Sequence, residues 1–175
     1  RLAHQGHVEF ERAARQNAWQ QALAAASAVP LADALTLRVA VATQGGGRIN
    51  QHFGHATEFQ VFEVSATQVQ LLGHRRVDHY CQGGYAEDEQ LPTVLRAIND
   101  CHAVLVAKVG ACPRVELAQA GIEPVDQYAG AFIEAAALTW FADYCTRVAA
   151  GSVQHPARGD AELRQGAFSG IALAA

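Results

Sequence analysis

The fold is decided by residues 37–64, LRVAVATQGGGRINQHFGHATEFQVFEV. The stretch begins with a largely apolar run, 37–42, and ends with a second run rich in Phe and Val, 59–64, and both runs predict β-strands. The loop between them holds a run of three glycines, a fourth glycine, one arginine and two histidines, which is more than a turn requires. Loops that exceed their connecting role usually carry function. We therefore expect the functional site in this loop.

The rest of the chain predicts a third strand and then alternating helices and strands. Further strands are expected at 68–77, 103–107 and 122–125, and helices near 91–98, 112–121 and 132–145. We expect Val69, Leu71 and Gly73 to share one face of the third strand, and Pro92 to lie in the first turn of the next helix. Early strands at short spacing favour a meander, and strand–helix–strand units favour parallel pairing. The predicted class is α/β, with a mixed sheet of about five strands flanked by helices.

Composition divides the chain into three regions. Residues 1–35 are rich in Ala, Gln and Arg and predict a helical arm or linker. Residues 36–147 form the compact domain, and 148–175 predict a poorly ordered tail. The chain begins with Arg1 and contains no methionine, from which we expect a fragment of a longer polypeptide.

The overall composition excludes several kinds of partner. A net charge of −4 over 175 residues argues against nucleic acid bound through bulk positive charge. The sequence shows neither a transmembrane span nor a signal peptide, so we expect no membrane partner. The four cysteines have no C-x-x-C spacing, which favours reduced thiols and a cytoplasmic location.

Basic side chains concentrate in the central third of this acidic chain. They are Arg48, His52, His55, His74, Arg75, Arg76, His79, Lys108 and Arg114. A local basic patch favours a small anionic ligand, and scattered surface charge is the alternative. In mixed sheets, ligands bind beyond the carboxyl ends of parallel strands. We expect the loops after the strands at 37–42 and 103–107 to converge there.

The candidate metal ligands are imidazoles and thiols. His52 and His55 lie three residues apart in the glycine-flanked loop, where both could face one ligand, and imidazole suits iron, zinc or copper. Thiolates at Cys81, beside Gly83 and Gly84, or at Cys112, at a predicted helix N-terminus, would favour iron–sulfur chemistry. The alternative is that Phe53 anchors the loop and the histidines merely face solvent. Cys101 and Cys145 are expected to be packing residues.

Two other kinds of site are not supported. The glycine run lacks the Lys-Ser/Thr of a P-loop and leads toward a strand rather than a helix, so it can equally serve backbone conformations with positive φ. No acidic residue lies in the strands at 37–43 and 103–109, so clustered carboxylates for hydrolysis are missing.

Several motifs together resemble a known family. They are VAVAT (39–43), GRINQHFGH (47–55), VDHYCQGG (77–84), VLVAKVGACP (104–113), AGIE (120–123) and YAGAFIE (128–134). Their sum is similar to the NifX/NafY-like domain of nitrogenase cofactor biosynthesis, and most similar to the version at the C-terminus of NifB proteins. The resemblance covers about residues 36–147.

The resemblance implies a ribonuclease-H-like α/β fold without catalytic activity. It also implies binding of an iron–sulfur precursor of the iron–molybdenum cofactor, of the NifB-co or FeMo-co type, with His52 as the leading ligand. His55, Cys81 and Cys112 are secondary ligands in this hypothesis, and Arg48 and Lys108 would balance the charge of the cluster. Partners would be nitrogenase cofactor assembly proteins and, in a NifB polypeptide, a radical S-adenosylmethionine domain. The cysteine motif of that domain is absent from this chain.

Two alternatives stay open. The chain could be a free-standing carrier or chaperone of the NifX/NafY type. It could also be a docking domain for assembly proteins that binds no cluster.

Overall fold

The computed structural model describes residues 2–77 and 87–153, so Cys81 and His79 lie outside the described residues. The described elements are α1 Leu2–Ser27, β1 Leu37–Val41, β2 Glu58–Val64, β3 Val69–Arg76, α2 Glu87–Ala97, β4 Ala103–Leu105, α3 Ala111–Gln119, β5 Glu123–Val125 and α4 Ile133–Ala149. Two short 3₁₀ helices, η1 Ala32–Ala34 and η2 Phe53–His55, lie in the loops. Within these residues no helix is both long and apolar enough to span a membrane.

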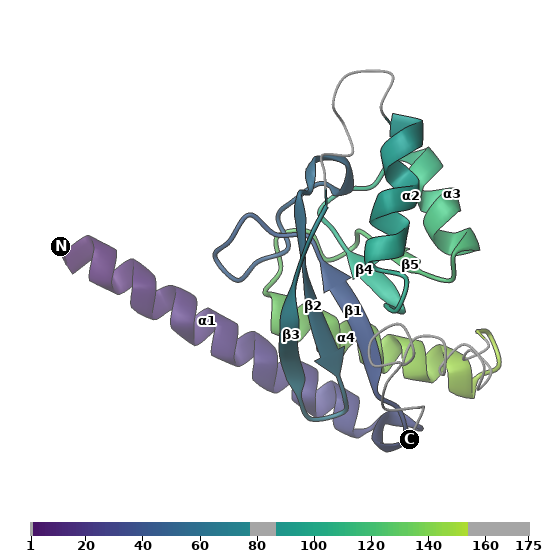
Figure 1. Cartoon of the computed structure of the whole chain (residues 1–175). Helices are drawn as coiled ribbons and strands as arrows, with labels where there is room; N and C mark the ends of the chain where they lie inside the picture. The colour runs from purple at the N-terminus through teal and green to yellow at the C-terminus, as the bar shows by residue number, and fades with distance from the viewer. Residues whose placement is uncertain (1, 78–86, 154–175) are drawn as a thin grey trace, which may run out of the picture.

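The five strands form one mixed sheet in the order β3-β2-β1-β4-β5 (Figure 1). The central strand β1 pairs antiparallel with β2 and parallel with β4. β3 continues the antiparallel meander, and β5 extends the parallel side. This order, with helices joining the parallel strands, confirms the predicted α/β fold and its ribonuclease-H-like topology. The carboxyl ends of β1 and β4 therefore point to the same edge of the sheet.

Each face of the sheet has its own core. On one face, Val39 and Leu105 pack with α4, whose Trp140 and Phe141 are almost fully buried. On the other face, Phe59 and Val104 pack with residues of α2 and α3. β1 is buried on both faces, which explains why its sequence is almost continuously apolar rather than alternating.

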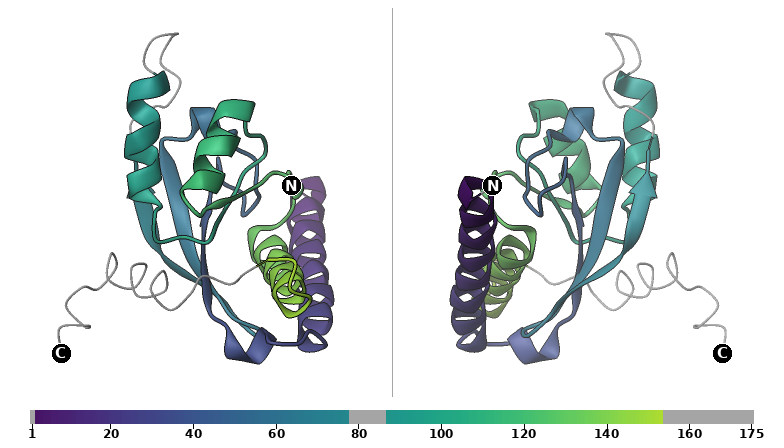
Figure 2. Two further views of the ribbon diagram at one scale, coloured as in Figure 1. Left: turned by 90° about the vertical axis from the view of Figure 1, so that its right-hand side faces the viewer. Right: turned by 90° about the vertical axis from the view of Figure 1, so that its left-hand side faces the viewer.

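Helix α1 lies alongside α4 (Figure 2). Its Ala22 and Ala26 are buried in the same core as α4, because small side chains allow the two helices to approach closely. The opposite end extends past the sheet, and there Phe10 is 69% exposed. The stretch predicted as an arm is thus a helix, and half of it packs on the domain. Its role as a linker stays a prediction.

The alternation expected in β3 was wrong at Gly73. Val69 and Leu71 pair with Val64 and Phe62 and share the α4 face of the sheet, but Gly73 pairs with Val61, which belongs to the opposite core. The cause is a β-bulge at Leu72, which inserts one extra residue and reverses the faces beyond it.

The position of Pro92 was also wrong. Helix α2 begins at Glu87, so Pro92 lies inside the helix rather than in its first turn. There it removes one backbone hydrogen bond of the helix. The burial of Val94, and of Ile98 just after the helix, against the sheet offsets this loss.

A buried ionic network joins the sheet to the end of α2. Asp100 is 1% exposed. Its carboxylate accepts hydrogen bonds from Arg38 of β1, at 2.8 Å, and from both terminal nitrogens of Arg75 of β3. Arg75 also donates to the carbonyl of Ala97. Burial would raise the pKa of Asp100, but the hydrogen bonds from Arg75 and Arg38 outweigh it, so this pKa is lowered.

Candidate functional site

The glycine loop leaves the end of β1 and is closed by its own polar side chains. Asn50 accepts a hydrogen bond from the backbone N–H of Gln44 at 2.7 Å and donates to the carbonyl of Gly45. The hydroxyl of Thr43 donates to the carbonyl of Arg48 at 2.6 Å. The loop is therefore built by local side-chain to backbone bonds, as Asn and Thr commonly do in turns. Sequence reasoning missed these two residues, although a Thr and an Asn flanking a glycine run are a turn signal.

The three glycines have backbone conformations that other residues rarely adopt. Their φ values are +113°, +73° and +69° at Gly45, Gly46 and Gly47. A Cβ at Gly45 or Gly46 would meet nothing, so conformation rather than crowding requires glycine there. The glycine run is therefore explained by its positive φ values, and this observation gives no support to a phosphate-binding loop.

The histidine loop and the loop after β4 lie side by side, as expected. His52 and Lys108 form an isolated parallel bridge. The N–H of Phe53 donates to the carbonyl of Lys108, and the N–H of Ala107 donates to the carbonyl of Gln51, both at 2.9 Å. Phe53 is 1% exposed, and its ring lies tilted against that of Phe59, with the centroids 5.9 Å apart. A buried phenyl ring and a short backbone ladder thus fix the position of His52.

His52 and His55 both point outward. Their side chains are exposed, and their rings lie stacked, with centroids 5.4 Å apart and planes inclined by 10°. The 3₁₀ turn η2, which includes the buried Phe53 between them, brings the rings together. Among the described residues, neither ring has a hydrogen bond or an ion pair. Phe53 does anchor the loop, and the histidines are available to an external group.

The stacked arrangement limits what the two histidines can bind together. A metal bound by an imidazole nitrogen lies close to the plane of that ring. Two nearly parallel, stacked planes do not share such a point, so the rings as they lie do not both ligate one small ion. They can contact two atoms of a larger object.

Two further exposed polar groups, Lys108 and Cys112, lie in and just after the loop that follows β4. Lys108 is exposed and has no ion pair among the described residues. Cys112 is the second residue of α3, four positions further on, and its thiol is exposed. The other two described cysteines, Cys101 and Cys145, are buried, which confirms them as packing residues.

Not all of the proposed ligands can be placed. Cys81 lies outside the described residues. Within residues 2–77 and 87–153, no three His, Cys, Asp or Glu side chains come close enough to hold a metal ion. The described part of the chain therefore offers exposed imidazoles, one thiol and one ammonium group, and not a closed metal cage.

Arg48 is occupied elsewhere. Its guanidinium donates two hydrogen bonds to Glu11 of α1, at 2.9 and 2.7 Å, and a third to the carbonyl of Gly130. It also stacks over the ring of Phe132, 4.0 Å from the centroid. The structure thus uses Arg48 to attach α1 to the loops, a role that the sequence did not indicate.

The basic side chains that the sequence grouped together divide into two sets. Arg48, His74, Arg75 and Arg114 contact carboxylates of Glu11, Glu58, Asp100 and Asp126. His52, His55, Lys108 and Arg76 contact no carboxylate within the described residues. Three of these four lie on the two loops that meet at the carboxyl ends of β1 and β4.

A model of the family described as "Dinitrogenase iron-molybdenum cofactor" matches residues 36–143. The chain belongs to this family. The match confirms the resemblance that the motifs indicated, and it includes both loops of the candidate site.

Individual relatives are similar over almost the whole chain. The FeMo cofactor biosynthesis protein NifB of Herbaspirillum seropedicae is 54% identical over 176 residues, which are 98% of this chain and 33% of that protein. The protein of the same name from Bradyrhizobium diazoefficiens is 49% identical over 91% of this chain and 32% of its own length. The chain thus spans about a third of the length of these relatives. Among solved structures, PH0822 overlaps with 70% of this chain and 97% of its own, at 17% identity and a TM-score of 0.41, which is too weak to be given weight.

Proposed function

We propose that this chain binds and carries an iron–sulfur precursor of the iron–molybdenum cofactor, as the C-terminal part of a NifB-type polypeptide. It would do so without catalysis, and the cluster would be its cargo. The observation that carries the proposal is the contact between the His52 loop and the Lys108 loop, which gathers unpartnered donors at one edge of the sheet.

The donor set suits a multinuclear anionic cargo. Imidazole and thiolate are ligands for iron–sulfur clusters. The parallel rings of His52 and His55 favour contact with two atoms of one cluster over chelation of a single ion. Lys108 is bridged to His52 through the backbone, and α3 begins three residues after Lys108. An ammonium group and a helix N-terminus both favour negative charge.

The exposure of the donors suits transfer. A carrier must release its cargo to the next protein, so few ligands on an open surface serve it better than a closed cage. His52, His55 and Cys112 are all exposed. Cys81 would add a second thiolate in the same hypothesis. Arg48 is paired with Glu11, so we now assign it to the support of the loop.

The test is anaerobic reconstitution with iron and sulfide or with a purified precursor cluster. We expect His52→Ala to lose most of the bound iron and of the cluster absorption bands. The matched control is His74→Ala, an exposed histidine on β3 that pairs with Glu58 and should leave loading unchanged. Equal iron content in the wild type and both variants would remove the proposal.

A pull-down with the loaded and the unloaded protein tests the docking alternative. A docking domain that binds no cluster would capture assembly proteins equally well with and without loading. A zinc titration adds a further check, because the stacked rings predict weak binding of a single ion, and tight zinc binding that needs both histidines would contradict the multinuclear cargo.

A further inference from the structure

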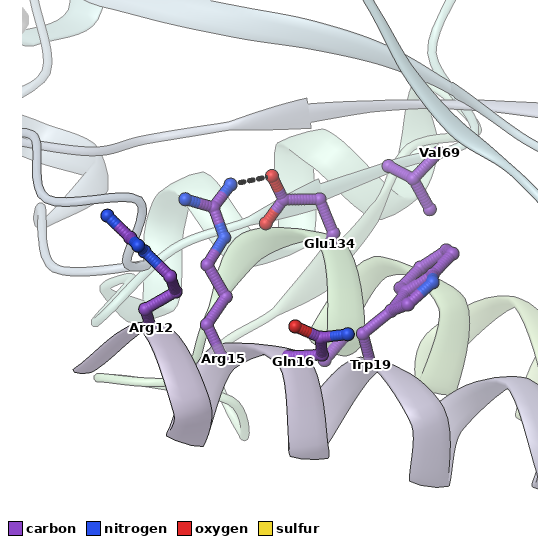
Figure 3. Close-up of a pocket in the computed structure, with 7 residues that line it drawn as sticks. Arg12, Arg15, Gln16, Trp19, Val69 and Glu134 are labelled. Atoms are coloured by element: carbon purple, nitrogen blue, oxygen red, sulfur yellow. Dashed lines mark hydrogen bonds and ion pairs between the residues drawn. The ribbon is translucent and has the colours of Figure 1, made fainter. Parts of the chain in front are cut away.

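A pocket lies on the face of the sheet that α4 covers, whereas the histidine loop packs into the core on the other face. It has a volume of about 370 Å³ and opens between α1, β3 and α4 (Figure 3). It is lined by Arg12, Arg15, Gln16, Trp19, Val69, Glu134 and Ala135. Four of these seven residues belong to α1, which precedes the region 36–143 that the family model matches. The pocket therefore depends on how α1 packs, and not on the family domain alone.

The α1 residues line the pocket because they share one face of the helix. Positions 12, 15, 16 and 19 are three and four residues apart, so their side chains project in one direction. Figure 3 shows the arginines and Trp19 rising from α1 toward α4 and β3. The apolar part consists of Trp19, Val69 and Ala135, and Leu71, 47% exposed, lies on the same sheet face beyond Val69.

The polar part of the pocket carries an excess positive charge. Arg15 pairs with Glu134 and also lies against Gly47, where a Cβ would come within 3.4 Å of its Nη1. Arg15 is therefore held between α4 and the glycine loop and is neutralised by its partner. Arg12 has no ion pair among the described residues, and Gln16 lies one turn further along the helix. Glu134 also keeps one buried carboxylate oxygen, Oε2, without a hydrogen-bond partner among the described residues. The lining therefore has a net positive charge, with Arg12 as its uncompensated cation, next to an apolar wall.

We propose that this pocket binds a small amphipathic organic anion. A planar apolar body would pack on Trp19 and Val69, and a carboxylate or sulfonate would contact Arg12. The volume is at the lower end of the range of roughly 300–1,000 Å³ that is usual for small-molecule sites. The pocket therefore suits a ligand with one flat aromatic body and one acidic group.

The test uses two dyes that share a similar aromatic body. The first is 8-anilinonaphthalene-1-sulfonate, and the second is the neutral N-phenyl-1-naphthylamine. Binding is followed by dye fluorescence and by energy transfer from Trp19, with Trp19→Phe to identify that donor. We expect saturable binding of the anionic dye at one site, which weakens as ionic strength rises.

The decisive variant is Arg12→Gln, with Arg76→Gln on β3 as the matched control. Loss of one charge-assisted contact predicts anion binding about threefold to tenfold weaker in Arg12→Gln, unchanged in Arg76→Gln, and largely restored in Arg12→Lys. Binding of the neutral dye should not change. Equal affinity of the wild type and Arg12→Gln for the anionic dye, or the absence of saturable binding, would overturn the proposal. Neither outcome bears on cluster binding at His52.

Discussion

Two groups of polar side chains in this molecule differ in every physical respect. In the first group, Arg38 and Arg75 donate hydrogen bonds to Asp100, whose carboxylate is 1% exposed. His52, His55, Lys108 and Cys112 are exposed at the carboxyl edge of the sheet and have no hydrogen-bonded side-chain partner among the described residues. The first group forms its hydrogen bonds within the fold, whereas the polar atoms of the second group remain available to bind another molecule.

The difference shows how a structural charge can be distinguished from a functional one. Burial of a charge is tolerated only when partners compensate it, so a buried network holds elements together. Exposed and unpaired side chains, three on the two converging loops and Cys112 in the first turn of α3, contribute little to stability. Substitutions should therefore separate stability from binding.

The largest effect is expected at the buried network. Asp100→Ala leaves Arg38 and Arg75 without their shared carboxylate, which predicts a loss of about 3–5 kcal/mol in the free energy of unfolding. Urea denaturation measures it. Asp143→Ala, which removes an exposed partner of Arg147, should cost less than about 1 kcal/mol. Similar losses in the two variants would contradict the assignment of Asp100.

The same network predicts acid sensitivity. The pKa of Asp100 lies below its ordinary value of 3.8, so the unfolded chain binds this proton more readily than the folded chain does. The stabilisation is therefore complete above about pH 4 and is lost as pH falls through the folded pKa. Unfolding measured from pH 6 to pH 2 should show this loss in the wild type and a smaller one in Asp100→Ala. Parallel curves would disprove the linkage.

A smaller effect is expected at Arg48. Arg48→Ala removes a partly exposed pair with Glu11 and the stacking on Phe132, for a loss of about 1–2 kcal/mol. Cluster loading should fall only slightly, because His52 is positioned by Phe53 and Lys108. Lys108→Ala serves as the comparison, since it should change stability by less than about 0.5 kcal/mol and weaken loading. The reverse pattern would make Arg48 the ligand-facing cation.

The smallest structural effect is expected at the thiols. Burial raises the pKa of Cys145 to about 11, so at pH 8 roughly one molecule in a thousand carries that thiolate. Cys112→Ser should remove one fast-reacting thiol in a reaction with Ellman's reagent, and Cys145→Ala should remove none. If cluster loading fails to slow the reaction of Cys112, this thiol is not a ligand.

The sequence predicted the fold because its local patterns agree with the tertiary structure. The apolar run of β1 corresponds to a strand that is buried on both faces. β2 also contributes to both cores, with Phe59 and Val61 in one and Phe62 and Val64 in the other. The errors at Gly73 and Pro92 arose where a bulge and an earlier helix start overrode the simple pattern. Neither leaves a clear signal in the spacing of apolar residues.

The site was predictable only in outline. The convergence of the two loops followed from the direction of the strands. The glycines have positive φ values and Phe53 is buried, as their side chains predict. The occupation of Arg48 by Glu11 could not be predicted, because the two are 37 residues apart and meet only when α1 packs beside α4. A basic residue in a functional loop can equally be used by the fold.

The most direct test of the central claim is the detection of imidazole nitrogen at the bound cluster. The protein would be labelled with ¹⁵N-histidine, loaded anaerobically, reduced to a paramagnetic state and studied by pulsed electron paramagnetic resonance. We predict a strong histidine nitrogen coupling that disappears in His52→Ala and persists in His74→Ala. A loaded wild-type protein without that coupling, or with the same coupling in His52→Ala, would contradict the account.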